Sequence, residues 1–328
     1  MINVVLLGRM ASWCEPELAR RLRSLPHTLT AIPDVRHIEQ HAAALSAAHV
    51  LVGWPLTDAI IARAPNLRLV QASGAGIDGV DLDRIPPGVR LANTFHHEVA
   101  IAEYVLMAML FLARRPHQYD ANLRSGNWDG SCIWGETPVL HELRGATVLL
   151  IGLGHIAREV AIRARAFAMR IVGVSRHPEK LKAPNLYDEL VPWAAWKERV
   201  SEADFLVPCC PLTPETEGLI NTEVYALMKS TAYVVNITRG RVLEEEATYQ
   251  ALLHHRIAGA AIDVWYQYPS DPAEPRLPSR FPFHELPNVL LSPHNSGWTL
   301  STIMGRVEDI AANITRLAED RPLLNLLK

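Results

Sequence analysis

The chain has 328 residues, which is long for one domain and sufficient for two domains with separate cores. Hydrophobic residues make up 49% of it and charged residues 20%, a globular composition that excludes an intrinsically disordered chain. The formal net charge of −3 gives no electrostatic basis for binding nucleic acid or an anionic membrane.

The cysteines and the N-terminal segment bear on the cellular setting. The spacing of Cys14, Cys132, Cys209 and Cys210 matches neither a zinc site nor a disulfide framework. We therefore expect no metal and a reducing, cytoplasmic environment. Residues 1–8 lack the charged region and cleavage site of a signal peptide, so they predict a first strand.

Short apolar runs alternate with helical patterns along the chain. The first series of predicted strands comprises residues 3–7, 28–32, 50–53, 68–72 and 89–92. The apolar stretch 99–113 is too short to span a bilayer and predicts a long buried helix. The second series comprises residues 147–151, 170–174, 205–207, 233–237, 258–263 and 289–291. Such alternation predicts parallel sheets with helices on both faces, and a final helix near 300–318 must dock on a sheet already formed.

A glycine-rich turn follows the first strand of the second series. Residues 152–157 read G-x-G-x-x-A, between a strand and a helix, with another strand about 20 residues further on. Gly152 permits the tight turn, Gly154 lets the backbone approach a pyrophosphate, and Ala157 allows close packing of helix on strand. This context predicts dinucleotide binding at the N-terminus of the helix.

The end of the next strand bears on which dinucleotide is bound. An NAD site normally has an acidic residue there, which accepts a hydrogen bond from the ribose 2′-hydroxyl. This chain has Ser175 and Arg176 instead, and both can bind a 2′-phosphate. We therefore predict NADP, with NAD as the second choice; the alternative is that Arg176 is a solvated surface residue.

Two further strands end in a residue suited to catalysis. Arg239 follows one apolar strand and His294 follows another. Ligands of open parallel sheets bind beyond the carboxyl ends of the strands. Arg239 is therefore a candidate for gripping a carboxylate, and His294 for moving a proton. Taken singly, each has an ordinary alternative: a surface arginine and a hydrogen-bonded loop histidine.

Together with the glycine-rich turn, these stretches make the sequence resemble the D-isomer-specific 2-hydroxyacid dehydrogenases over nearly its whole length. The stretches are SGAGIDGVD (73–81), IAEY (101–104), RSGNW (124–128), ELRGATVLLIGLGHIA (142–157), PLTPET (211–216), VNITRGRVLEEEA (235–247), GAAIDVW (259–265) and SPHNSG (292–297). The resemblance implies an α/β fold of two doubly wound parallel-sheet domains. A Rossmann-type cofactor domain, residues 100–289, would be inserted into a flavodoxin-like substrate domain, residues 1–99 and 290–328. It also implies a homodimer through the cofactor domain.

The resemblance further implies roles for individual residues. Backbone N–H groups of Ala75 and Gly76 would hold the substrate carboxylate in a cleft between the domains. Arg239 would hold the carboxylate and the carbonyl oxygen, and His294 would protonate the new hydroxyl as hydride arrives at C2. The residues implied for cofactor binding are Gly152, Gly154, His155, Ile156, Ser175, Arg176, Pro211, Thr216, Ile237, Thr238, Asp263, His294 and Gly297.

One position departs from the family pattern. The family has a glutamate shortly after the Asp-Val-aromatic run, and it orients the catalytic histidine; the stretch 263–269, DVWYQYP, has Tyr268 at that place. A tyrosine can fix the tautomer of His294 but supplies no negative charge. Three outcomes stay open: catalysis with a less basic histidine, substitution by another acid such as Glu98, or loss of turnover. Trp265, Tyr266 and Tyr268 are otherwise packing residues beneath a loop.

The leading hypothesis is an oxidoreductase that reduces a 2-oxo acid to a 2-hydroxy acid, the D-isomer by resemblance. Glyoxylate, hydroxypyruvate and substituted pyruvates are the candidate substrates. The alternative is a dinucleotide-sensing binding protein of the same fold, similar to the related corepressors, which the tyrosine at 268 favours and the intact pair of Arg239 and His294 disfavours. His96, His97 and Glu98 are candidates for tuning the substrate.

Overall fold

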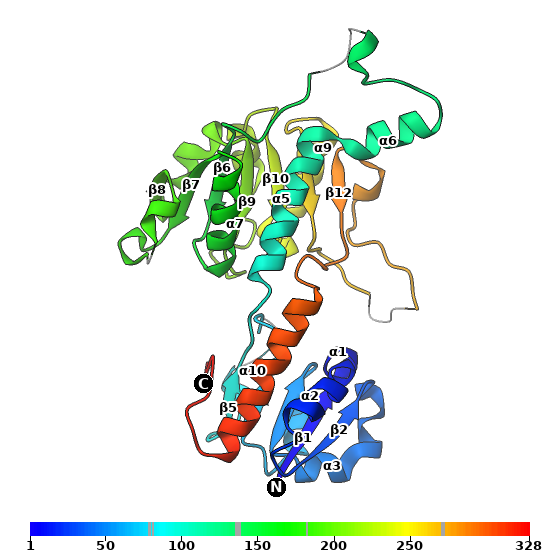
Figure 1. The fold of residues 1–328 in the computed structure, drawn as a ribbon, viewed down its shortest axis with the longest axis vertical. Helices are drawn as coiled ribbons and strands as arrows, with labels where there is room; N and C mark the ends of the chain where they lie inside the picture. Colours follow the sequence, from blue (N-terminus) through cyan, green and yellow to red (C-terminus); the bar gives the residue numbers. More distant parts are fainter. Residues whose placement is uncertain (78–79, 81, 135–138, 182, 270–272) are drawn as a thin grey trace. The chain divides into compact units, whose positions relative to one another are not determined.

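The chain divides into two compact units in the computed structural model, which describes residues 1–77, 80, 82–134, 139–181, 183–269 and 273–328. Unit 1 comprises Met1–His97 and Trp298–Lys328, and unit 2 comprises Glu98–Gly297 (Figure 1). Residues 78, 79 and 81 of the motif at 73–81 lie outside the described residues. Within the described ranges, no helix combines the length and the apolar character needed to cross a membrane.

Unit 1 contains a five-stranded parallel sheet with the order β2-β1-β3-β4-β5. Its strands are β1 (Ile2–Leu7), β2 (His27–Ile32), β3 (Val50–Gly53), β4 (Leu69–Gln71) and β5 (Arg90–Ala92). Its α-helices are α1 (Gly8–Trp13), α2 (Glu15–Arg21), α3 (Ala42–Ala47), α4 (Asp58–Ala62) and α10 (Leu300–Ala318). This strand order is that of flavodoxin-like folds.

Apolar side chains on both faces of this sheet are buried, which is why its strands read as continuous hydrophobic runs. One face packs against α1, α2 and α10, and the other packs against α3 and α4. The C-terminal helix α10 therefore docks on the sheet built by the first hundred residues, as a helix without a sheet of its own must.

Unit 2 contains a seven-stranded parallel sheet with the order β12-β11-β10-β9-β6-β7-β8. Its strands are β6 (Thr147–Ile151), β7 (Arg170–Ser175), β8 (Glu189–Pro192), β9 (Phe205–Pro208), β10 (Tyr233–Asn236), β11 (Gly259–Ile262) and β12 (Val289–Leu291). The helices are α5 (Glu98–Arg114), α6 (Pro116–Arg124), α7 (His155–Ala166), α8 (Thr222–Leu227) and α9 (Glu245–Leu253), and the 3-10 helices η6 (Trp193–Glu202) and η7 (Gly240–Val242) also belong to this unit.

The order of this sheet is the Rossmann order with one additional strand, β12. Helices α5 and α7 lie side by side over one face (Figure 1), and α8, α9 and η6 cover the other. The predicted fold class of two doubly wound parallel-sheet domains is confirmed. Where each functional domain ends stays a prediction, although β12 and the loop up to Gly297 belong to unit 2.

Candidate active site

The glycine-rich turn joins β6 to α7 in unit 2. Gly152 has a φ of +94°, and a Cβ on it would lie 3.0 Å from atoms of Cys210, so both conformation and space require glycine. A Cβ on Gly154, the N-cap of α7, would meet nothing within 4 Å. The fully buried Ala157 packs the helix onto the sheet. The turn therefore exposes its backbone at a helix N-terminus, which fits the pyrophosphate of a dinucleotide.

An acidic residue lies beside the end of β7, although none stands at the strand end in the sequence itself. The Arg176 Nη1 atom lies 3.9 Å from Oε2 of Glu215, and both side chains are exposed. Ser175 Oγ accepts a hydrogen bond from the backbone N–H of His177 at 3.1 Å. The sequence analysis missed Glu215 because the two residues are 39 positions apart, and only the parallel pairing of β6 with both β7 and β9 brings these segments together.

The loop that follows β9 is held by its own side chains. The Thr216 hydroxyl donates to the carbonyl oxygen of Pro211 at 2.6 Å and accepts from the Thr213 N–H at 2.8 Å. Burial raises the pKa of Cys210 to about 11, so its thiol stays protonated at neutral pH. This agrees with Cys210 acting in packing rather than in redox chemistry.

The loop after β10 presents Arg239. The Asn236 Oδ1 accepts from the Thr238 N–H and hydroxyl at 3.2 and 3.1 Å, while its Nδ2 donates to the Arg239 carbonyl at 3.0 Å. The Arg239 Nη1 donates to the Thr238 carbonyl at 2.7 Å. A Cβ on Gly240 would lie 2.4 Å from the Trp265 backbone, so this loop packs directly against the segment after β11.

Asp263 holds the loop that contains His294. This fully buried residue follows β11, and its carboxylate accepts hydrogen bonds from the Ser292 hydroxyl at 2.6 Å and from the N–H groups of Asn295 and Ser296, both at 3.0 Å. His294 has a φ of +58°, a left-handed conformation that is strained for a residue with a Cβ. Bonding of the carboxylate to the next two N–H groups stabilises that conformation.

Tyr104 extends this network from helix α5. Its hydroxyl lies 2.6 Å from Ser292 Oγ. Because Ser292 donates its only proton to Asp263, Tyr104 must be the donor to Ser292. Burial raises the pKa of Tyr104 to about 12, which keeps this proton in place. The sequence analysis gave Tyr104 no role because a tyrosine in an apolar helix is usually part of the core.

Tyr268 contacts His294. The Tyr268 hydroxyl lies 3.0 Å from His294 Nδ1, and it also accepts the Trp265 backbone N–H at 3.1 Å. The Tyr268 hydroxyl can donate to a bare Nδ1 of the neutral imidazole or accept from a protonated Nδ1, and it accepts from Nδ1–H when the imidazole is protonated. Trp265 is buried and donates through Nε1 to the Ser292 carbonyl at 2.8 Å, while the Tyr266 ring lies 6.4 Å from that of Phe283. Only one of the three aromatics thus contacts the histidine.

Burial and two charged groups shift the pKa of His294. Partial burial of the imidazole is the largest influence and lowers its pKa below the usual value; the Asp263 carboxylate raises the pKa, and Arg239 lowers it again. Asp263 is therefore a source of the negative charge that a glutamate at position 268 would supply. The sequence analysis had suggested Glu98 for this role; among the described residues, the carboxylate that shifts the pKa of His294 is that of Asp263.

In unit 1, Ala75 and Gly76 lie in the loop that follows β4. The Ala75 carbonyl accepts the Asn93 side-chain N–H at 3.0 Å, and the Gly74 carbonyl accepts the Thr94 N–H at 3.3 Å. These bonds tie the loop to the residues after β5, so that its conformation depends on both strands.

His96 contacts helix α10. Its Nε2 lies 3.0 Å from Asp309 Oδ2, and its ring packs so closely on Gly305 that a Cβ there would lie 2.5 Å from the ring. His96 has a φ of +72°. The structure thus explains why glycine is needed at 305, whereas the predicted role of His96, His97 and Glu98 in substrate selection stays a prediction.

Comparison with known proteins identifies the class to which this fold and site belong. Residues 106–296, more than half of the chain, match the family model described as the NAD binding domain of D-isomer specific 2-hydroxyacid dehydrogenase. The chain therefore belongs to the D-isomer-specific 2-hydroxyacid dehydrogenases, a family of NAD(P)-dependent oxidoreductases, as the resemblance predicted.

Individual relatives agree with this assignment. The chain is 36% identical over 255 residues to glyoxylate reductase of Thermococcus gammatolerans, covering 76% of this chain and 73% of that protein. It is 29% identical over 325 residues to glyoxylate/hydroxypyruvate reductase A of Arabidopsis thaliana, covering 98% of both. It is 34% identical over 249 residues to D-3-phosphoglycerate dehydrogenase of Methanocaldococcus jannaschii, covering 75% of this chain but only 45% of that longer protein.

A solved structure shows the same fold. The crystal structure of a D-isomer specific 2-hydroxyacid dehydrogenase family protein from Aeromonas salmonicida superposes with a TM-score of 0.83. The match covers 100% of this chain and 99% of that one at 24% identity, so it supports the fold alone.

Proposed function

We propose that this protein reduces a 2-oxo acid to a 2-hydroxy acid of the D configuration with a nicotinamide dinucleotide. The observation that supports this most directly is the placement of His294, with Tyr268 at its Nδ1 and the Asp263 carboxylate holding its loop, in a domain with a dinucleotide-binding turn. A histidine whose ring is held in place by a hydrogen bond at Nδ1 can use Nε2 for general acid–base catalysis.

Each residue has a definite task in this proposal. Ala75 and Gly76 bind the substrate carboxylate through their N–H groups, and Arg239 binds the carboxylate and the carbonyl oxygen. A planar guanidinium suits both because it presents several N–H donors in a fixed geometry. His294 in its protonated form gives the Nε2 proton to the carbonyl oxygen as it becomes a hydroxyl. When bound, the reduced nicotinamide supplies the hydride.

The residues proposed to hold the cofactor extend from the turn after β6 to the loop after β12. The free backbone at Gly154 fits its pyrophosphate, and Asp263 would face its carboxamide. The full set is Gly152, Gly154, His155, Ile156, Ser175, Arg176, Pro211, Thr216, Ile237, Thr238, Asp263, His294 and Gly297.

We propose NADPH rather than NADH as the preferred cofactor. Arg176 at the end of β7 offers a charged partner for a 2′-phosphate. Its distance of 3.9 Å from Glu215 corresponds to a weak, exposed ion pair that a bound phosphate can replace. Glu215 in turn provides an acceptor for a ribose hydroxyl, so the balance between Arg176 and Glu215 sets the preference.

Glyoxylate and hydroxypyruvate are the first substrates to test, because two relatives carry these names. Substituted pyruvates are the next group. The experiment is a spectrophotometric screen of 2-oxo acids with NADPH and with NADH, following loss of the reduced nicotinamide. Turnover of at least one acid is the expected result, and failure of all of them with both cofactors would contradict an enzymatic function.

That second outcome would favour a dinucleotide-sensing binding protein of the same fold. The observation that favours the sensor is Tyr268, which contacts His294 but, unlike a glutamate, carries no negative charge. Tight binding of either dinucleotide without turnover would support the sensor. Turnover that is abolished by His294→Asn would exclude it.

A homodimer through the cofactor domain is also part of the proposal. Helix α6 runs outward from the end of α5 (Figure 1), and large apolar side chains are exposed on it and on the segment after it, namely Leu123, Trp128, Ile133 and Val139. Exposed apolar side chains gathered on one segment are typical of an interface between chains. We also propose a reducing, cytoplasmic setting, in which the four free cysteines stay reduced.

A further inference from the structure

Three buried polar atoms gather in unit 1 around the loops that follow β4 and β5. Ser73, Asn93 and Thr94 are 5%, 5% and 0% exposed, and among the described residues no hydrogen-bond partner reaches Ser73 Oγ, Asn93 Oδ1 or Thr94 Oγ1. Buried polar atoms without partners are rare in native proteins, and each requires a physical explanation. These three flank the loop that contains Ala75 and Gly76.

A cation from helix α10 lies against the same loop. A Cβ on Gly74 would lie 3.8 Å from Arg306 Nη1 and 3.9 Å from Cζ and Nη2, so the guanidinium packs on the backbone of residue 74. Arg306 Nε donates to the Phe95 carbonyl at 3.1 Å, which holds the side chain in place. The charge of Arg306 affects the Cys14 thiol: burial raises the pKa of Cys14, and Arg306 partly opposes that rise.

The surroundings of Arg306 distinguish this position from a surface arginine. Arg306 lines a cavity of about 20 Å³ together with Met10, Cys14, Ser73 and Trp298, among other residues. That volume holds about one water molecule and no substrate. A ligand of Arg306 therefore cannot occupy this cavity. Trp298, which lines it, is half-exposed, and its ring lies 6.4 Å from that of the half-exposed Trp13.

We infer that Arg306 is a specificity residue for a second carboxylate of the substrate, so that the preferred substrates are 2-oxo dicarboxylic acids. This inference rests on the proposed function, in which Ala75 and Gly76 bind the first carboxylate. Arg306 packs on the residue directly before them, and a guanidinium can bind a carboxylate through two parallel hydrogen bonds.

The competing explanation is that Arg306 has a structural role, of which its hydrogen bond to the Phe95 carbonyl is one part. Loss of a structural tie would lower the activity toward every substrate and would lower the melting temperature. Loss of a specificity residue would affect only substrates with the second carboxylate. Matched pairs of substrates separate these two roles.

The test compares 2-oxobutanedioate with 2-oxobutanoate and 2-oxopentanedioate with 2-oxopentanoate, each pair differing by a terminal carboxylate, with glyoxylate as the reference. We expect wild-type kcat/KM to be at least about tenfold higher for a diacid than for its monoacid. Arg306→Gln should lower the diacid value by about 10- to 100-fold, mainly through KM, and leave glyoxylate within about twofold. Arg306→Lys should retain part of the preference.

Arg316→Gln is the matched control, because Arg316 lies on the same helix and donates to the Pro322 carbonyl at 2.9 Å. It should leave all five substrates unchanged. If Arg306→Gln fails to fold, inhibition of wild-type glyoxylate reduction answers the question: butanedioate should inhibit at least about tenfold more strongly than butanoate.

The outcomes separate the inference from the proposed function. Reduction of glyoxylate without any diacid preference, or an equal loss on all substrates in Arg306→Gln, would overturn the inference and leave the proposed function standing. Preference for bulky apolar 2-oxo acids would overturn it as well and would assign the two tryptophans to the substrate. Absence of turnover with every acid would remove the proposed function itself, and the inference with it.

Discussion

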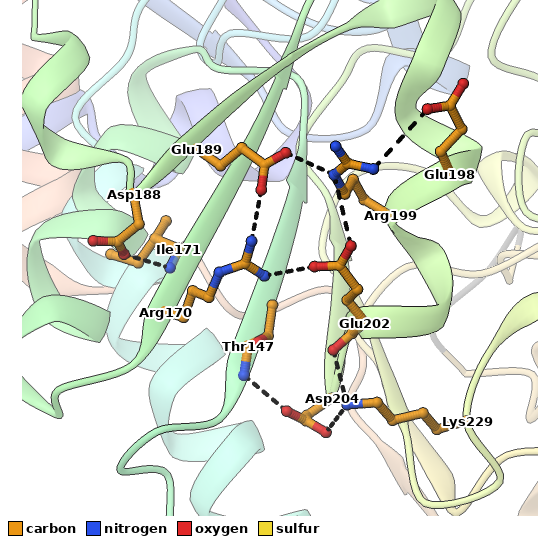
Figure 2. A network of polar contacts seen from close by, with 10 residues as sticks. All are labelled: Thr147, Arg170, Ile171, Asp188, Glu189, Glu198, Arg199, Glu202, Asp204 and Lys229. Carbon is orange, nitrogen blue, oxygen red and sulfur yellow. Dashed lines mark hydrogen bonds and ion pairs between the residues drawn. The ribbon is translucent and has the colours of Figure 1, made fainter.

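Charged residues are arranged differently at the two ends of the strands of the seven-stranded sheet, which we call the amino edge and the carboxyl edge. At the amino edge, where strands begin, a network of ion pairs surrounds Arg170, the first residue of β7 (Figure 2). Arg170 pairs with Glu189 at 2.6 Å and with Glu202 at 2.8 Å, and Lys229 pairs with Asp204 at 2.7 Å. Each cation in Figure 2 therefore faces at least one carboxylate.

The carboxyl edge, where strands end, has a different arrangement. The Asp263 carboxylate is directed to a serine hydroxyl and two backbone N–H groups rather than to a cation. Arg239 and His294 follow two other strands, and Arg239 lowers the pKa of His294. Charges therefore pair with one another where the strands begin, whereas the charged residues that follow the strand ends are those that we propose to bind the anionic substrate.

The largest effect is expected from His294→Asn. Removing a general acid should lower the reductase kcat by roughly 10²- to 10⁴-fold, while the dissociation constant of the cofactor changes little. Stopped-flow or steady-state reduction of the best substrate measures kcat. Fluorescence titration with NADPH measures the dissociation constant of the cofactor. Retention of more than a tenth of the wild-type kcat would remove His294 from the chemistry.

Arg239→Lys is expected to have the next largest effect. A lysine keeps the charge but cannot reproduce a planar fork, so KM for the oxo acid should rise and kcat should fall, lowering kcat/KM by roughly 10- to 100-fold. Arg241→Lys is the matched control in the same loop, because Arg241 is exposed and pairs with Glu217 at 3.0 Å. Equal behaviour of the two variants would show that Arg239 does not bind the substrate.

The cofactor preference should respond to Arg176→Ala. Losing a charged contact to a 2′-phosphate should lower kcat/KM with NADPH by about 10- to 100-fold and change the value with NADH little. Glu215→Gln should move the preference the other way, toward NADPH, because the competing carboxylate is gone. Equal effects of Arg176→Ala on both cofactors would contradict the proposed contact.

The pH profile should respond to Tyr268→Glu. Reduction needs protonated His294, and partial burial lowers its pKa, so wild-type kcat/KM should fall as pH rises through a value below about 6.5. A carboxylate at 268 favours the imidazolium and should move this decline to higher pH by about one unit. Tyr268→Gln is the control, because glutamine has the size of glutamate but no negative charge.

Thermal stability must be measured in parallel, because Tyr268 also accepts the Trp265 N–H. A stable, active Tyr268→Glu protein with an unmoved profile would mean that the tyrosine does not influence His294 in solution.

The smallest effect is expected at the amino edge. Arg170→Met removes two partly exposed ion pairs, so we expect a loss of about 1 kcal/mol in the free energy of unfolding, smaller at high salt. Chemical denaturation at low and high ionic strength measures it. The kinetic constants should stay unchanged. A change of more than a few-fold in kcat/KM would contradict a purely structural role for the ion pairs at the amino edge.

The sequence alone predicted the fold class and most strand positions. Fully buried parallel strands appear as continuous apolar runs, and helix α10 was predicted at 300–318, where the structure has Leu300–Ala318. Strand β8 was missed because it lies at the edge of the sheet, is short and half-buried, and ends in a proline, so it lacks an apolar run.

The candidate site was predictable where chemistry follows a strand end in the sequence itself. Arg239, His294 and the turn at 152–157 could be found this way, because the sheet brings the ends of parallel strands to one edge. The place of Tyr268 beside His294 followed from counting along a family pattern, and the hydrogen bond between them is present in the structure.

Contacts between segments far apart in the chain were decided only by the tertiary structure. Three contacts join residues 29 to 232 positions apart. They are Glu215 beside Arg176, the donation from Tyr104 through Ser292 to Asp263, and the packing of Arg306 on Gly74. Local periodicity and turn chemistry depend on neighbours within a few residues, so they determine which elements form. Which groups are buried and which charges meet depends on how those elements pack; burial first, and then Asp263 and Arg239, determine the direction in which the pKa of His294 moves.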